Sequence, residues 1–262
     1  MNKVKLNNFS ISNNLPFVLV VGPCVIEDEK HSLFMAEKIN NICENLKINY
    51  IYKSSFDKAN RSSISSSRGV GLKEAIKIFK KIKNNFNCPI ITDVHNEYQC
   101  EFLTNEDSID VIQIPAFLCR QTDLLIAAGR SDKVINVKKG QFLSPNEIKN
   151  IYGKIESTKN NKILITERGT SFGYNNLVSD FKAIEIMKKF NYPVIFDATH
   201  SVQEPGGLGS KSGGKREFIF PLAKAAIAVG VAGLFIETHQ DPDNAPSDGP
   251  NMLDIKDLKT LI

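Results

Sequence analysis

The sequence predicts an α/β protein that folds as one (β/α)₈ barrel, a TIM barrel, with a short N-terminal β-hairpin in front of it. Three observations lead to this prediction. The chain has 262 residues, 42% of them are hydrophobic, and short apolar runs alternate with amphipathic stretches along its length. This length suits one barrel, and strands that alternate with helices are typical of a parallel sheet with crossover helices. We therefore expect a single catalytic domain over residues 1–262, with the hairpin in residues 1–15.

The predicted elements follow one another in a regular order. Val4–Leu6 and Phe9–Ile11 flank Asn7-Asn8, which suits a tight hairpin turn at the bottom of the barrel. The stretches between the later apolar runs have helical spacing, as in residues 72–82. Eight strands in strict alternation favour a closed barrel, and a doubly wound open sheet is the alternative. The eight predicted barrel strands are Phe17–Val21, Tyr50–Lys53, Ile90–Asp93, Val111–Ile114, Val134–Val137, Ile163–Thr166, Val194–Asp197 and Leu234–Glu237.

Composition and charge exclude several classes of function. The net charge of +4 is mild, there is no Trp, and the lysines form no basic stripe with interleaved aromatic residues, so we expect no nucleic-acid partner. The first apolar run, Phe17–Val21, is too short for a signal peptide or a membrane helix, so we expect a cytoplasmic protein without a membrane partner. The five cysteines include no CxxC pair, which favours a reducing compartment over a disulfide framework.

The carboxyl ends of the predicted strands are unusually polar. In a (β/α)₈ barrel these ends meet at one mouth, where the active site lies. Cations among them, together with Lys58 and Arg61, predict a site for a ligand with two anionic groups such as phosphate and carboxylate. For each lysine taken alone, a solvated surface charge is the alternative. The polar residues at the strand ends are Cys24, Lys53, Asp93, His95, Gln113, Lys138, Lys139, Glu167, Arg168, Asp197, His200, Glu237 and His239.

Three of these residues are predicted to form a second cluster. Cys24, His200 and Glu237 lie on adjacent strand ends, because the eighth strand closes the barrel between the first and the seventh. A thiolate, an imidazole and a carboxylate suit a divalent metal of the zinc, iron or manganese kind, and Asp248 in the next loop is a candidate fourth ligand. Spacing alone leaves purely structural roles equally open. We expect no such neighbours around His239.

Three further segments receive weaker predictions. Gly69-Val70-Gly71 has some likeness to a phosphate loop, but it lacks the third glycine and the ribose-binding carboxylate of a dinucleotide motif. The glycine-rich stretch 206–214 is predicted to be a mobile lid above the mouth, with a long solvent loop as the alternative. His31 is expected to open a surface helix.

Several motifs resemble one known family. KSSFDKANRSS, ITDVH, IQIPAFLCRQTDLL, NVKKGQF, TERGTSFGYNNLV, DATHSVQEPGG and GLFIETH are similar to the motifs of the 3-deoxy-D-manno-octulosonate 8-phosphate synthases, in the family's order from Val20 to Glu237. The resemblance implies a (β/α)₈ barrel that condenses phosphoenolpyruvate with D-arabinose 5-phosphate and water. The products would be 3-deoxy-D-manno-octulosonate 8-phosphate and phosphate, on the route to the Kdo of lipopolysaccharide. It also implies a homotetramer.

The resemblance implies roles for individual residues. Lys53, Lys58, Gln113, Lys138 and Arg168 would hold phosphoenolpyruvate, and Asn60, Arg61 and Ser62 would hold arabinose 5-phosphate, with Arg120 reaching a neighbouring subunit's site. Cys24, His200, Glu237 and Asp248 match the metal ligands of the family's metal-dependent branch, whereas the other branch has Asn in place of Cys24. Of these residues, Lys53, Lys58, Lys138, Arg168, His200 and Cys24 would take part in catalysis. Gly249-Pro250, after Asp248, departs from the metal-dependent pattern and resembles the metal-independent branch.

Three other functions remain open from the sequence. A 3-deoxy-D-arabino-heptulosonate 7-phosphate synthase would take erythrose 4-phosphate in place of the five-carbon sugar, but its acceptor loop typically contains KPRTS where this chain has KANRSS. A Schiff-base aldolase would use Lys53 as its nucleophile. A barrel that binds phosphorylated ligands without turnover would leave Cys24, His200 and Glu237 without a role.

Overall fold

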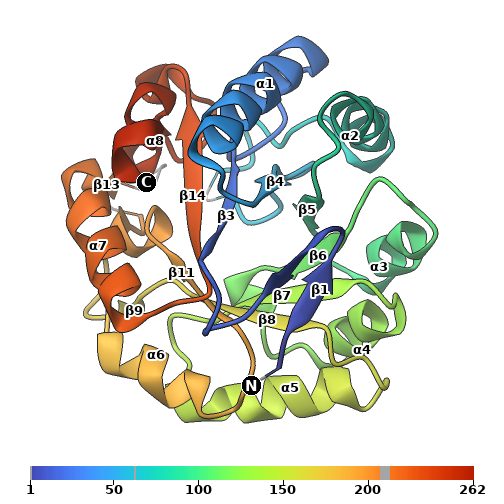
Figure 1. The fold of residues 1–262 in the computed structure, drawn as a ribbon, viewed down its shortest axis with the longest axis vertical. Helices are drawn as coiled ribbons and strands as arrows, with labels where there is room; N and C mark the ends of the chain where they lie inside the picture. The colour runs from blue at the N-terminus through green and yellow to red at the C-terminus, as the bar shows by residue number, and fades with distance from the viewer. Residues whose placement is uncertain (1, 62, 207–212) are drawn as a thin grey trace.

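The computed structural model describes residues 2–61, 63–206 and 213–262. Within these residues, eight parallel strands pair side by side, and the pairing of β11 with β14 closes them into a barrel. Each strand leads into a helix, so that the helices surround the sheet (Figure 1). The strands are β3 (Val18–Gly22), β4 (Tyr50–Lys53), β5 (Ile90–Asp93), β6 (Val111–Ile114), β7 (Val134–Lys138), β8 (Ile163–Glu167), β11 (Val194–Asp197) and β14 (Gly233–His239). The helices are α1 (Glu29–Leu46), α2 (Leu72–Phe86), α3 (Glu97–Thr104), α4 (Thr122–Arg130), α5 (Ile148–Glu156), α6 (Phe181–Lys188), α7 (Ile219–Val229) and α8 (Ile255–Leu261).

The predicted closed barrel is therefore confirmed, and the open sheet is excluded. Every predicted strand is present, with ends that differ by at most two residues; the last one, for example, runs from Gly233 to His239 instead of Leu234 to Glu237. Hydrogen bonding to neighbouring strands sets these ends, and a single sequence carries little information about it.

Short strands and turns of helix lie in the loops that connect the barrel elements. Two-residue ladders join β9 (Thr170–Ser171) to β10 (Leu177–Val178) and β12 (Gln203–Glu204) to β13 (Gly213–Gly214), and β15 (Leu253–Asp254) extends the sheet beside β14. Turns of 3₁₀-helix lie in the loops at Ala116–Leu118, Pro145–Glu147, His200–Val202, Arg216–Phe218, Pro242–Asn244 and Gly249–Asn251. None of the helices in the described part of the chain is long and apolar enough to cross a membrane.

The predicted hairpin is also present and closes the amino-terminal end of the barrel. β1 (Val4–Leu6) pairs with β2 (Phe9–Ile11), and Asn7 takes up the left-handed conformation of the turn, with φ of 49°. Val4, Leu6 and Ile11 are buried against apolar side chains from all eight barrel strands, including Ile51 and Phe235. The hairpin therefore acts as a plug at the bottom of the barrel, away from the strand ends that carry the polar residues.

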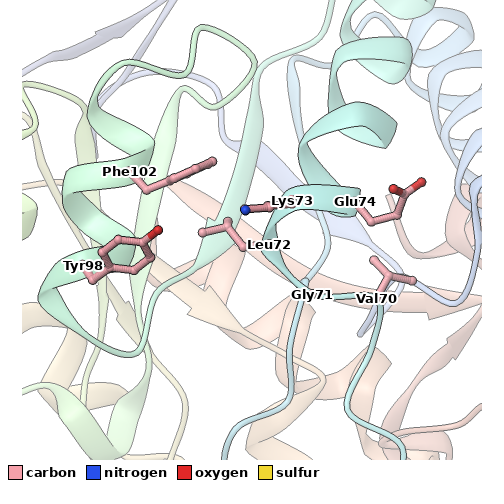
Figure 2. A pocket seen from close by; sticks show the side chains of 7 residues that line it. All are labelled: Val70, Gly71, Leu72, Lys73, Glu74, Tyr98 and Phe102. Carbon is pink, nitrogen blue, oxygen red and sulfur yellow. The ribbon is translucent and has the colours of Figure 1, made fainter.

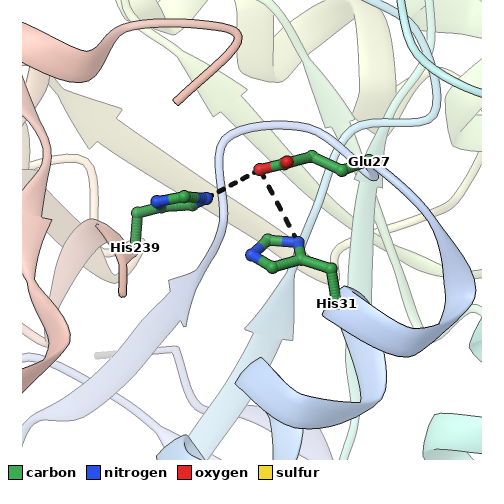
Figure 3. Close-up of side chains that lie close together, drawn as sticks. All are labelled: Glu27, His31 and His239. Atoms are coloured by element: carbon green, nitrogen blue, oxygen red, sulfur yellow. Dashed lines mark hydrogen bonds and ion pairs between the residues drawn. The ribbon is translucent and has the colours of Figure 1, made fainter. Parts of the chain in front are cut away.

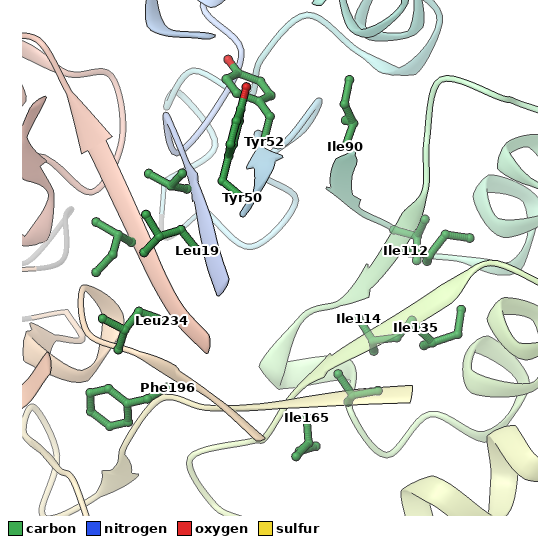
Figure 4. Close-up of a cluster of buried hydrophobic side chains, with 14 of the residues drawn as sticks. Leu19, Tyr50, Tyr52, Ile90, Ile112, Ile114, Ile135, Ile165, Phe196 and Leu234 are labelled. Atoms are coloured by element: carbon green, nitrogen blue, oxygen red, sulfur yellow. The ribbon is translucent and has the colours of Figure 1, made fainter. Parts of the chain in front are cut away.

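Side chains alternate between the inside and the outside of the barrel. Leu19, Tyr52 and Ile112 face outward into the layer between the sheet and the helices, as Figure 4 shows. The residues between them face inward, where Ile51 packs with the hairpin. Lys53, Asp93, Gln113, Lys138, Asp197 and Glu237 share the inward direction, two or four residues beyond an apolar interior residue. This alternation places them above the apolar core, at the mouth.

Candidate active site

A cavity of about 720 Å³ lies at the carboxyl ends of the strands. The structure brings most of the predicted site residues into it. Its walls include Lys53, Lys58, Asn60, Arg61, Gln113, Lys138, Arg168, His200, Glu237 and Asp248. Cys24 lies directly behind this wall, with its Sγ 3.1 Å from Asp248 Oδ2. Residues from four strands, and from the loops that follow five strands, thus converge on one volume, as the strand ends of a barrel require.

One predicted residue, Arg120, stands apart from this group, and two further predictions fall wholly or partly outside the described residues. Arg120 is exposed in the loop after β6 and does not line the cavity, and its carbonyl accepts a hydrogen bond from Lys154 Nζ at 2.7 Å. Ser62 lies outside the described residues. Of the predicted lid, Gly206, Gly213 and Gly214 are described and residues 207–212 are not.

The lysines on one side of the cavity are buried and paired with acids. Lys53 Nζ donates to Glu237 Oε1 at 2.7 Å and to Cys24 O and Ser55 Oγ, each at 3.1 Å. Burial alone would lower the pKa of Lys58, but the negative charges of Cys24, Glu237 and Asp248 hold it well above its usual value. Lys58 is therefore an ammonium ion, and the Nζ of Lys53 has three acceptors around it, one for each N–H of an ammonium group.

Lys138 and Arg168, on the other side of the cavity, are less fully neutralised by acidic partners. Lys138 forms an ion pair with Asp197, and its Nζ lies 3.1 Å from the centre of the Phe235 ring. Burial lowers the pKa of Lys138 to about 8, although Asp197 opposes the shift. The Arg168 guanidinium donates to Gln203 Oε1 at 2.8 Å, whereas its buried Nε has no hydrogen-bond partner among the described residues. This side of the cavity can accept further negative charge from a ligand.

A chain of buried polar side chains runs along the barrel wall from Thr166 to Ser55, which accepts from Lys53. Thr166 Oγ1 donates to Asn136 Oδ1 at 2.7 Å, and Asn136 Nδ2 donates to Gln113 Oε1 at 2.8 Å. Gln113 Nε2 in turn donates to Asp93, which also accepts from Ser55 Oγ at 2.5 Å. Each of these side chains therefore has a fixed orientation, and the amide of Gln113 is held by partners on both sides. Asn136 and Ser55 were not predicted from the sequence. The available signal was their place in the alternation of side chains, which turns both of them toward the inside of the barrel.

The second predicted cluster also assembles. One ligand atom each from Cys24, Glu237 and Asp248 lies within 4.8 Å of the others. His200 Nε2 is 3.6 Å from Glu237 Oε2 and 4.0 Å from Asp248 Oδ2. Glu237 Oε2 is buried without a hydrogen-bond partner in the described part of the chain, and it faces this group.

The protonation of His200 suits a metal ligand. Its Nδ1 lies 2.7 Å from Asp197 Oδ2, and because a carboxylate only accepts, Nδ1 carries the proton. In the neutral imidazole the lone pair of Nε2 then points toward Glu237 and Asp248, which is the arrangement found in carboxylate–histidine–metal sites. Burial, Asp248 and Glu237 raise the pKa of the Cys24 thiol well above its usual value. A divalent cation would reverse this effect and favour the thiolate, so the four residues fit such an ion.

The prediction that His239 has no acidic or histidine neighbours is wrong. Its Nε2 lies 2.7 Å from Glu27 Oε1, and its ring centre lies 4.8 Å from that of His31 (Figure 3). His31 lies in the first turn of α1, as expected, and its side chain is only 9% exposed because it turns toward His239 and Glu27. Glu27 follows β3 and His239 ends β14, and these ends are adjacent only after the barrel closes.

This second histidine cluster is poorly suited to a metal ion. The backbone N–H of Asp241 donates to His239 Nδ1 at 3.0 Å, so the ring proton resides on Nε2 and is donated to Glu27. The atom that faces the cluster therefore has no free lone pair, in contrast to Nε2 of His200. The hydrogen bond from His239 to Glu27 thus joins the end of β14 to the loop after β3, and His31 is held beside it by a 2.7 Å hydrogen bond between its Nε2 and Gln240 Oε1.

A smaller cavity of about 400 Å³ lies outside the mouth, between the start of α2 and α3. Figure 2 shows that its walls combine Val70 and Gly71, from the predicted glycine segment, with Tyr98 and Phe102. Lys73 and Glu74 contribute one charge of each sign, and no further cation among the described residues lines this cavity. The glycine segment therefore lies apart from the cations of the large cavity.

Comparisons with known proteins agree with this geometry. The model of the DAHP synthetase I family matches residues 2–262. A Rickettsia typhi protein is 57% identical to this chain over 259 residues. The aligned part covers 99% of this chain and 94% of the length of the relative. Relatives from Rickettsia rickettsii and Bartonella henselae are 56% identical over 99% of this chain and cover 94% and 92% of their own lengths. All three are named 2-dehydro-3-deoxyphosphooctonate aldolase, which is another name for a 3-deoxy-D-manno-octulosonate 8-phosphate synthase, so the predicted resemblance is confirmed. This chain belongs to the DAHP synthetase I family, among the relatives that carry this aldolase name.

Proposed function

We propose that this chain condenses phosphoenolpyruvate with D-arabinose 5-phosphate and water, giving 3-deoxy-D-manno-octulosonate 8-phosphate and inorganic phosphate for Kdo and lipopolysaccharide biosynthesis. The observation that carries the proposal is the convergence of Lys53, Lys58, Arg61, Lys138 and Arg168 on one cavity. Two phosphates and a carboxylate must be held together in this reaction, and a group of cations of this size suits that charge. The names of the relatives support the same assignment.

Phosphoenolpyruvate is proposed to bind between the two groups of cations. Lys138 and Arg168 lie on the side of the cavity where the positive charge is only partly neutralised. Within the described site, Arg168 Nε is free to donate to an anionic oxygen. Lys53, Lys58 and Gln113 line the opposite wall. Charge-assisted bonds from both sides would fix the plane of the enol ether.

Arabinose 5-phosphate is proposed to bind nearer the opening, at Asn60, Arg61 and Ser62. Arg61 now donates to Pro246 O at 2.6 Å and to Ser247 Oγ at 2.9 Å, so it must exchange these partners for the sugar phosphate. Arg120 is proposed to complete the site of a neighbouring subunit in a homotetramer. Its exposed position away from the cavity of its own chain is compatible with that role.

In the proposed reaction, C3 of phosphoenolpyruvate attacks the aldehyde, water adds to C2, and phosphate leaves with cleavage of the C–O bond. The cations offset the charge of both substrates while the reacting carbons are held in line. A Schiff base on Lys53 is disfavoured, because three acceptors within 3.1 Å of its Nζ leave no direction open for a lone pair to attack a carbonyl carbon.

Cys24, His200, Glu237 and Asp248 are proposed to hold a divalent metal ion of the zinc, iron or manganese kind. Such an ion supplies a Lewis acid at the edge of the cavity. Asp197 keeps His200 in the tautomer that offers Nε2, and Glu237 joins this cluster to Lys53. The proposed location of the enzyme is the cytoplasm, since the five cysteines, all in the described residues, are free thiols.

Phosphate release with alternative aldoses tests the proposed reaction. The purified protein is incubated with phosphoenolpyruvate and either arabinose 5-phosphate or erythrose 4-phosphate, and phosphate is measured over time. We expect turnover with the five-carbon sugar. A preference for erythrose 4-phosphate would instead make the chain a 3-deoxy-D-arabino-heptulosonate 7-phosphate synthase, and binding without turnover of either sugar would make it a non-catalytic barrel.

A further inference from the structure

A buried ion pair stands directly behind two cations of the cavity. Lys139 and Glu167 are 0% and 1% exposed, and Lys139 Nζ lies 3.4 Å from Glu167 Oε2. Both residues take the outward direction of the strand pattern, one position away from Lys138 and Arg168, which face the cavity. The pair therefore lies outside the barrel wall and does not line the cavity itself.

Glu167 holds the backbone that carries Arg168. Its Oε1 accepts the backbone N–H of Arg168 at 3.0 Å and that of Gly169 at 2.7 Å. Gly169 has a φ of 90°, a conformation that favours glycine, so the chain turns sharply at this point. The direction in which the Arg168 side chain leaves the backbone is thus set by the carboxylate of Glu167.

Lys139 holds the neighbouring loop in the same way. Its Nζ donates to Leu143 O at 3.0 Å and to Gly140 O at 3.3 Å, and its backbone N–H donates to Thr166 O at 2.8 Å. The loop enclosed by these bonds includes Gln141, which also lines the cavity. One ion pair therefore ties together the two strand ends from which Lys138 and Arg168 project.

We propose that Lys139 and Glu167 are positioning residues that hold Lys138 and Arg168 at the spacing required by the carboxylate and phosphate of phosphoenolpyruvate. The proposal rests on the proposed function, since it names the enol donor as the ligand. A buried ion pair is commonly no more stabilising than a well-packed apolar pair. A role in geometry accounts for a charge pair at this place better than a role in stability does.

Glu167→Gln separates the two roles. Oε1 accepts from two backbone N–H groups, and Oε2 lies 3.4 Å from the Lys139 ammonium without a hydrogen-bond partner in the described part of the chain. An amide must therefore place its NH₂ either against the two backbone donors or against a cation. We expect the KM for phosphoenolpyruvate to rise about tenfold or more, since small displacements of positioning groups are costly. The KM for arabinose 5-phosphate should stay within about twofold, because its proposed partners lie on other loops. Glu167→Asp keeps the charge and should recover part of the loss.

The double variant Lys139→Met, Glu167→Met tests whether stability explains the effect. It removes both charges together and should regain the thermal stability that either single change loses, while the KM for phosphoenolpyruvate stays raised. Asp110→Asn is the matched control. Asp110 pairs with Lys83 at 2.7 Å and accepts the backbone N–H of Ile90 at 2.8 Å, at the opposite end of the barrel. It should lower the melting temperature and leave both KM values unchanged.

Two results would overturn the proposal: an unchanged KM for phosphoenolpyruvate in folded Glu167→Gln, or a double variant in which that KM recovers together with the melting temperature. The wild type is assayed first. Its failure to release phosphate from phosphoenolpyruvate and arabinose 5-phosphate would refute the proposed function, whereas normal wild-type turnover with either of the two results above would refute only the positioning role.

Discussion

Asp197 contacts both Lys138, which lines the cavity, and His200, a predicted metal ligand. Its replacement by Asn should therefore impair both substrate binding and the proposed metal site. Oδ1 accepts from Thr199 N, Thr199 Oγ1 and His200 N at 3.1, 3.0 and 2.8 Å. Oδ2 accepts from His200 Nδ1 at 2.7 Å and from Lys138 Nζ. Every acceptor position of the carboxylate therefore faces a donor, and the NH₂ of an Asn would face donors in either orientation.

The expected losses of stability and activity follow from the charge that remains on Lys138 when Asp197 is removed. Removing one partner of a buried ion pair costs about 3–5 kcal/mol of folding stability, since Lys138 remains buried without its counter-ion. The pKa of Lys138 is already lowered to about 8 by burial, and Asp197 is the main group that raises it. Without Asp197 the pKa falls further, so that Lys138 is largely neutral near pH 7.5. We expect kcat/KM for phosphoenolpyruvate to fall about 100-fold or more at that pH.

The assay combines denaturant unfolding with the pH profile of kcat/KM. In Asp197→Asn the alkaline loss of activity should move to lower pH than in the wild type. Asp180→Asn is the control: Asp180 caps α6 by accepting from Lys182 N at 3.0 Å, and Asn caps a helix equally well. A loss of less than about 1 kcal/mol together with an unmoved alkaline limb would refute the role assigned to Asp197.

Three further predictions concern the wild type and simpler variants. First, kcat/KM for phosphoenolpyruvate should decline as pH rises through about 8, where buried Lys138 loses its proton and its charge; a profile flat from pH 7 to 9.5 would contradict this pKa. Second, chelator treatment should abolish activity together with bound metal measured by mass spectrometry, and Cys24→Asn should retain part of its activity after the same treatment; full activity in verified metal-free wild type would refute dependence. Third, Asp28→Ala should cost about 1 kcal/mol of stability, because Asp28 Oδ1 caps α1 by accepting from His31 N at 2.7 Å, and kcat should stay unchanged; a stability equal to the wild type would show that the cap contributes nothing.

The sequence could predict the fold because local pattern and fold agree. Alternating apolar runs and amphipathic stretches occur in the order of a barrel, and the polar residues appear where each run ends. Once the barrel is assumed, the carboxyl ends of the strands must meet, so Lys53, Lys138 and Arg168 were expected at one mouth. The motifs around Lys58 and Asn60 added the resemblance to one family. These inferences need only residue type and order.

The sequence alone could not predict which side chains pair with one another. Lys53 meets Glu237 across 184 positions and Lys138 meets Asp197 across 59, and which acid meets which lysine depends on strand register. The same limit produced the error at His239, whose neighbours come from the loop after β3 and from α1.

The sequence by itself therefore determined the barrel, the polar mouth and the set of residues available for chemistry, because these follow from periodicity and from strand order. Only the tertiary structure decided how those residues are used. His200 and His239 are both histidines near the end of a strand, yet Asp197 leaves a lone pair on Nε2 of one, and the N–H of Asp241 leaves a proton on Nε2 of the other. The chemical character of a histidine is set by the atoms that contact its ring, and those contacts exist only after the chain has folded.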